Sequence, residues 1–90
     1  MSVSELNQLA SKASQIDSSI ELTRREIIEI TGITASNVRR WDTLDPCPPS
    51  TYTGSTSPRM YEARGLVQWC LYTSRHDFAA KIIDAVSHSN

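Results

Sequence analysis

Residues 22–41, LTRREIIEITGITASNVRRW, carry the clearest structural signal in this chain. Thr23 and Glu26 have the spacing of a capping box, which marks the start of a helix. Gly32 ends that helix, because glycine adopts the left-handed backbone conformation at little cost. Thr34 is a suitable N-cap for a second helix. The stretch therefore predicts two short helices joined by a tight, glycine-containing turn, which is the helix-turn-helix arrangement.

The second helix, predicted over residues 35–44, has two different faces. Val38 and Trp41 are three residues apart, so they share a face and are expected to pack on the first helix. The rest of the helix surface carries short polar side chains and guanidiniums, namely Ser36, Asn37, Arg39 and Arg40. Groups of these types reach phosphates and base edges in a DNA major groove. The alternative interpretation is an ordinary solvated helix face.

The charge balance gives mixed information on nucleic-acid binding. A formal net charge of −1 over 90 residues argues mildly against it, because DNA-binding domains are often basic. Arginines nevertheless gather in the central part of the chain, at Arg24, Arg25, Arg39, Arg40, Arg59 and Arg64. Acidic residues, including Asp42 and Asp45, share that region. A basic face would therefore have to be produced by the folded geometry.

The residues after the second helix predict a hairpin. Three prolines within residues 46–49 exclude a helix, because proline lacks an N–H donor and biases the preceding residue toward an extended backbone. Residues 51–53 and 59–61 then predict two short strands, with residues 54–57 as the tip. Such a hairpin beside a helix-turn-helix is a wing. The alternative is an irregular loop.

Further helices are predicted on both sides of this central region. Residues 1–19 predict an accessory N-terminal helix with Ser4 as its N-cap and a loop at its end, and residues 20–22 are expected to be briefly extended. Residues 76–90 predict an amphipathic C-terminal helix, which either folds back on the domain or forms a surface for a partner. We favour folding back, because small domains need the buried area. The expected organisation is mainly α, with a winged helix-turn-helix over residues 20–75 between these two flanking helices.

Other features of the sequence narrow the class of protein. No apolar run is long enough to span a bilayer, and the N-terminus lacks the pattern of a secretory signal, so a cytoplasmic location is expected. Cys47 and Cys70, taken with His76 and His88, match no common zinc-ligand spacing. No Gly-rich phosphate loop and no paired-carboxylate motif is present. We therefore expect neither a cofactor nor enzymatic activity.

The order of these elements resembles the MerR-like winged helix-turn-helix superfamily. Residues 31–33 (TGI) and, four residues later, 38–41 (VRRW) resemble its first helix pair. Residues 59–61 (RMY) resemble the end of its wing, and residues 66–69 (LVQW) are similar to the helix that follows the wing in phage excisionases and phage terminase small subunits. The resemblance covers roughly residues 22–75. The long dimerisation helix of MerR regulators is absent, so an effector-sensing regulator is not expected.

The resemblance implies binding of double-stranded DNA in the cytoplasm of a bacterial host cell. On this chain the implied contacts of the second helix and its cap are Thr34, Ser36, Asn37, Arg39 and Arg40. The implied wing contacts are Arg59 and Tyr61. The implied role is a transcription regulator or excisionase-like architectural factor of a phage or mobile element, acting as a dimer or as a cooperative array on DNA. The alternatives are a terminase small-subunit DNA-recognition domain and a protein-interaction module that kept the fold without DNA binding.

Overall fold

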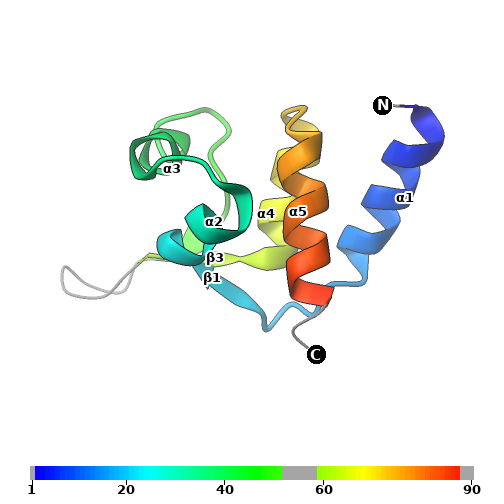
Figure 1. The fold of residues 1–90 in the computed structure, drawn as a ribbon, viewed down its shortest axis with the longest axis horizontal. Helices are drawn as coiled ribbons and strands as arrows, with labels where there is room; N and C mark the ends of the chain where they lie inside the picture. Colours follow the sequence, from blue (N-terminus) through cyan, green and yellow to red (C-terminus); the bar gives the residue numbers. More distant parts are fainter. Residues whose placement is uncertain (1, 52–58, 88–90) are drawn as a thin grey trace.

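The computed structural model describes residues 2–51 and 59–87, and within them the chain forms five α-helices and one three-stranded antiparallel sheet (Figure 1). In chain order the elements are α1 (Val3–Ser14), β1 (Glu21–Thr23), α2 (Arg24–Thr31), α3 (Ala35–Trp41), β2 (Ser50–Thr51), β3 (Met60–Glu62), α4 (Ala63–Tyr72) and α5 (His76–Ser87). The predicted mainly helical class is therefore confirmed. Among these residues, no helix combines the length and the apolar character that a membrane crossing requires.

The α2–α3 pair starts at the caps that the sequence predicted. The Thr23 hydroxyl accepts a hydrogen bond from the Glu26 amide at 3.1 Å, and the Glu26 carboxylate accepts one from the Thr23 amide at 3.0 Å. Both halves of the capping box are therefore formed. Thr34 caps α3 by accepting from the Asn37 amide at 3.3 Å. Gly32 ends α2 with a φ of 77°, in the left-handed region.

Gly32→Val is expected to lower the free energy of unfolding by about 1–3 kcal/mol, the usual cost of a strained backbone position. A Cβ at Gly32 would meet nothing within 4 Å, so the cost comes from the backbone conformation and not from a clash. Gly32→Asn is the control, because asparagine tolerates the left-handed region better than valine does. Urea unfolding of the three proteins measures the difference. A valine variant as stable as the wild type would mean that the turn does not need this conformation.

The end of α3 differs from the prediction. The helix ends at Trp41 and not at residue 44, and the amides of residues 42–44 donate to carbonyls three residues earlier instead of four. Pro46 follows, and proline disfavours a helical conformation in the residue before it. The last turn is therefore tighter than an α-helix and leads directly into the proline-rich segment.

The proline-rich segment packs on α4. The Pro46 carbonyl accepts a hydrogen bond from Nε1 of Trp69 at 2.9 Å, and Pro48 is fully buried. Pro49 lies so close to Gly65 that a Cβ there would come within 2.9 Å of the proline Cγ. This close approach explains a glycine inside α4, where it would otherwise only weaken the helix. The connection that leaves α3 is thus held against the centre of the molecule.

The three short strands form one sheet with β3 in the middle. β1 and β2 both pair antiparallel with β3, so that Leu22 lies opposite Tyr61 and Thr51 lies opposite Met60. The β2–β3 pair lies where the hairpin was predicted, although β2 starts at Ser50, one residue earlier, and β3 starts at Met60, one residue later. The predicted tip, residues 54–57, lies outside the described residues. The expected extended segment at residues 20–22 is β1, which is one residue displaced and belongs to the same sheet.

One hydrophobic core joins all of these helices. Figure 1 shows α4 and α5 side by side, with α1 on one side of them and the α2–α3 pair on the other, and α5 packs on α1, α2 and α4. The expectation that the C-terminal segment folds back is therefore confirmed. Trp41 is buried at the end of α3, and its ring centroid lies 5.1 Å from that of Trp69. This contact fixes α3 to α4.

The N-cap of α1 is Ser2, and the prediction of Ser4 was wrong. The Ser2 hydroxyl accepts a hydrogen bond from the Glu5 amide at 3.2 Å, and Ser2 has the extended backbone of a cap. Ser4 is the second residue of α1, so it lies inside the helix and not at the flanking cap position. At the other end, Nε of Arg64 donates to the Ile16 carbonyl at 2.7 Å, which ties the segment after α1 to α4.

Candidate nucleic-acid interface

The outer face of α3 presents all of the side chains that the sequence assigned to this helix. Ser36, Asn37, Arg39 and Arg40 are exposed, as is Thr34 at the cap. Val38 and Trp41, on the opposite face, are 0% and 4% exposed. The apolar side chains therefore hold the helix while the polar ones point outward. Thr34 has a structural role as well, because its hydroxyl caps the helix and lies 3.2 Å from the Ser36 hydroxyl.

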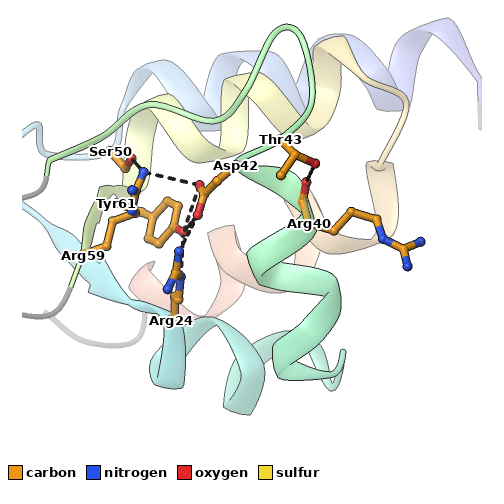
Figure 2. Close-up of polar contacts among 7 residues, drawn as sticks. All are labelled: Arg24, Arg40, Asp42, Thr43, Ser50, Arg59 and Tyr61. Atoms are coloured by element: carbon orange, nitrogen blue, oxygen red, sulfur yellow. Dashed lines mark hydrogen bonds and ion pairs between the residues drawn. The ribbon is translucent and has the colours of Figure 1, made fainter.

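The guanidiniums of Arg39 and Arg40 have no hydrogen bond and no ion pair with any side chain in the described part of the chain. Figure 2 shows the Arg40 side chain extending away from the neighbouring polar residues, while its backbone carbonyl accepts from the Thr43 hydroxyl at 2.7 Å. Arg25 on α2 differs, since it pairs with Glu29 at 3.4 Å. The two arginines of α3 therefore keep their full hydrogen-bonding capacity for an external acceptor.

Asp42, directly after α3, is the centre of a polar cluster with Arg24, Arg59 and Tyr61, which we call the Asp42 cluster (Figure 2). Its carboxylate accepts from Nη2 of Arg24 and from the Tyr61 hydroxyl at 3.1 Å, and it lies 3.7 Å from Nη1 of Arg59. Nε of Arg24 donates to the Tyr61 hydroxyl at 3.2 Å. The cluster thus joins the end of α3 to the start of α2 and to β3.

The ionisation of the cluster suits these hydrogen bonds. Burial raises the pKa of Tyr61 above its ordinary value of 10.0, so the hydroxyl stays protonated and donates to Asp42 at neutral pH. Hydrogen bonds to Tyr61 and then to Asp42 raise the pKa of Arg24 above its ordinary value, so its guanidinium stays charged. The side chain of Asp42 is only 14% exposed. The cluster is therefore a partly buried element of the fold and not a solvated surface pair.

Tyr61 does not fit the role that the resemblance implied for it. Its side chain is 0% exposed and lies in the core, with the hydroxyl bonded to Asp42 and Arg24, so it has no surface with which to contact DNA. Arg59 is more accessible, but Nη1 donates to the Ser50 hydroxyl at 3.1 Å and lies close to Asp42. A phosphate would have to compete with Asp42 for Arg59. The strongest part of the candidate site is therefore α3.

A groove of about 240 Å³ lies beside α3. Asn37, Arg40, Trp41 and Leu44 line it from α3 and the turn after it, and Arg75 and Phe78 line it from the turn before α5 and from α5 itself. Arg75 comes from the turn between α4 and α5, and no pattern in the sequence predicts that it lies near α3. The sequence identifies Arg75 only as a positively charged residue. The packing of α5 is what brings it close to α3.

The cysteines and histidines do not come together in the described residues. Cys47 is exposed and Cys70 is fully buried, and burial raises the pKa of the Cys70 thiol to about 12. Cys70 is therefore a protonated core residue at neutral pH. No cluster of three or more His, Cys, Asp or Glu side chains suited to a metal occurs in residues 2–51 and 59–87. His88 lies outside these residues.

No protein-family model, curated protein or solved structure matches this chain. A functional assignment therefore depends on the surface chemistry and geometry of the molecule. Of the surfaces in the described residues, the outer face of α3 and the groove beside it hold the side chains best suited to a polar, negatively charged partner.

Proposed function

We propose that this chain binds double-stranded DNA in a sequence-specific manner and that its fold is a winged helix-turn-helix. The observation that carries the proposal is the outer face of α3, which is fixed to the core and carries an exposed amide and two guanidiniums. Neither guanidinium pairs with a side chain in residues 2–51 and 59–87. In this arrangement α3 enters the major groove. Asn37 hydrogen-bonds to an adenine, and Arg40 hydrogen-bonds to a guanine through both arms of its guanidinium. Ser36 and Arg39 contact the adjoining phosphates.

The arrangement of the neighbouring elements supports this proposal. α2 and α3 are joined by residues 32–34 only, and the antiparallel β2–β3 pair follows them and precedes α4. This is the order in which the MerR-like superfamily places its helix pair, its wing and the next helix. The corresponding role is a transcription regulator or an excisionase-like architectural factor of a phage or mobile element, with several copies side by side on DNA. A terminase small-subunit recognition domain is the nearest alternative role.

The charge distribution removes much of the objection raised by the negative net charge. Asp42 is the acidic residue closest to α3 in sequence, and its carboxylate is directed into the Asp42 cluster and not toward the outer face of the helix. Its charge is balanced there by Arg24 and Arg59. The outer face of α3 therefore keeps the positive charge of Arg39 and Arg40, although the chain as a whole is slightly acidic.

Asn37→Ala and Arg40→Ala are each expected to weaken binding to a specific site by about 1–3 kcal/mol, or about 5- to 150-fold. Binding to a scrambled duplex should change far less, because it depends on phosphate contacts. The measurement is a fluorescence-anisotropy titration at two salt concentrations. One duplex is selected by the protein from a random-sequence pool, and the other is its scrambled version.

Lys12→Ala is the matched control, because it removes one positive charge from α1, on the far side of α4 and α5 from α3 (Figure 1). It should leave both affinities nearly unchanged. The proposal fails if the wild-type protein selects no sequence and binds neither duplex at micromolar concentration and low salt.

That failure would favour a protein-interaction module with the same fold. The observation in its favour is a second groove, between α1 and α5, which is larger than the groove beside α3, at about 860 Å³. Apolar side chains such as Leu9 and Ile83 line this groove together with Lys12 and Asp84. A mixed lining of this kind is typical of protein contacts more than of DNA contacts.

A further inference from the structure

The turn between α4 and α5 holds Arg75 in a defined place. Ser74 has a φ of 66°, in the left-handed region, and the Arg75 amide donates to the Cys70 carbonyl at 2.7 Å. The Arg75 carbonyl in turn accepts from the Ala79 amide at 3.1 Å, inside the first turn of α5. The backbone on both sides of Arg75 is therefore fixed by hydrogen bonds to the two central helices.

The side chain of Arg75 is fixed by stacking. Its guanidinium carbon lies 4.6 Å from the centroid of the Trp69 ring and 6.0 Å from that of Trp41. A guanidinium over an aromatic face is held by cation–π attraction and keeps its in-plane N–H donors available. One of these donors reaches the Thr73 carbonyl at 3.5 Å. Within residues 2–51 and 59–87, no carboxylate forms an ion pair with Arg75.

Arg75 lies close to α3, although the two are far apart in the sequence. Arg75 and Arg40 both line the groove together with Trp41, although Arg40 lies on α3 and Arg75 lies in the turn before α5. The same indole therefore anchors α3 in the core and supports the guanidinium of a residue that is far away in the sequence. Arg40 and Arg75 thus place two positive charges in one groove, and neither forms an ion pair with an acidic residue in the described part of the chain. Such a groove suits a backbone with regularly spaced negative charges that passes along the edge of α3.

We propose that Arg75 binds a backbone phosphate of the DNA strand that borders the major groove occupied by α3. The inference rests on the proposed function and adds a contact from outside the helix pair and the β2–β3 pair. Arg75 is stacked on the Trp69 ring, and its guanidinium donates one long hydrogen bond to a backbone carbonyl. Its other N–H donors can form paired hydrogen bonds to the phosphate oxygens, which is the strongest kind of phosphate contact. Because a phosphate contact carries no base information, Arg75 sets the register of α3 and does not select the sequence.

The test compares Arg75→Gln, which removes the charge, with Arg75→Lys, which keeps it. Association constants are measured against salt concentration for the selected duplex and for its scrambled version. Arg75→Gln should weaken both complexes by a similar factor and reduce the slope of log K against log salt by about one unit. Arg75→Lys should keep the wild-type slope. Lys12→Gln on α1 is the charge-matched control and should also keep it.

The outcomes separate the inference from the proposed function. If the wild type binds DNA and Arg75→Gln keeps the full slope, Arg75 only supports the tryptophans, and α3 still binds DNA without it. If the wild type binds no DNA, both proposals fall. Since Arg75→Gln can also destabilise the fold, a second measurement uses the wild-type protein. Modification of Arg75 by phenylglyoxal, followed by mass spectrometry, should slow several-fold in the presence of saturating duplex. Unchanged modification would overturn the inference.

Discussion

Replacing Trp41 with alanine is expected to lower the free energy of unfolding by about 3–5 kcal/mol, the usual cost of deleting a large buried aromatic side chain. Trp41 is 4% exposed, and its ring centroid lies 5.1 Å from Trp69 and 6.0 Å from Phe78. These partners belong to α4 and α5, which are fixed by the rest of the core, so the cavity cannot close easily. The total free energy of unfolding of a native protein is only about 5–15 kcal/mol. Much of the variant should therefore be unfolded near physiological temperature.

Urea unfolding followed by far-UV circular dichroism measures this effect. Leu44→Ala is the control, because Leu44 lies three residues later and is 36% exposed. Its effect should stay within about 0.5 kcal/mol, as for other surface substitutions. A Trp41→Ala variant with wild-type stability and no DNA binding would place the indole on the binding surface and not in the core.

Replacing Asp42 with alanine is expected to have two opposite effects. It should lower the free energy of unfolding by about 2–3 kcal/mol, because hydrogen bonds to charged groups contribute about 1.5–3 kcal/mol and several end on this carboxylate. The full 3–5 kcal/mol of a buried pair is not expected, since the Arg24 and Arg59 side chains are 36% and 31% exposed and water screens them in part. The same change removes the carboxylate that balances the charges of Arg24 and Arg59. Binding to a scrambled duplex should therefore become tighter, although Arg59 keeps its hydrogen bond to Ser50 and Arg24 keeps its bond to Tyr61.

The control for Asp42→Ala is Glu29→Ala, which changes the net charge by the same amount. Glu29 pairs with Arg25 on the surface of α2, where the side chains are 66% and 89% exposed. Such pairs contribute about 0.3–0.5 kcal/mol, so the stability of this variant should stay close to wild type. The quantities to compare are the urea midpoints and the salt dependence of non-specific binding. Equal behaviour of the two variants would show that the Asp42 cluster has no special role.

The helix pair could be predicted because its signals are local. A capping box needs residues three positions apart, and the end of α2 needs one glycine, so the sequence around Thr23, Gly32 and Thr34 contains all of the relevant chemistry. The end of α3 was placed three residues too late, because helical spacing continues past Trp41 while the chain tightens before Pro46. For α1, helical periodicity predicted the helix but did not define its first residue, so the predicted cap, Ser4, lies two residues after the observed cap, Ser2.

The candidate site was predictable to the extent that it lies on one helix. Asn37, Arg39 and Arg40 are exposed because Val38 and Trp41 fix the opposite face, and that division follows from helical spacing. The positions of Tyr61 and Arg75 depend on tertiary contacts. Tyr61 is buried because β3 is the central strand of the sheet, and Arg75 lies near α3 because α5 packs on α2. Neither the burial of Tyr61 nor the position of Arg75 can be predicted from the local pattern of residues.

The Asp42 cluster and the outer arginines should respond differently to ionic strength. Partly buried ion pairs are screened by salt much less than charges in open solvent. Moderate salt should therefore weaken the proposed DNA contacts of Arg39 and Arg40 and leave the contacts of Asp42 largely intact. The angle between α3 and the β2–β3 pair should therefore be the same in free protein and in protein bound to DNA. Molecules released by salt would rebind without any conformational search, and the association rate would be limited by encounter and orientation alone.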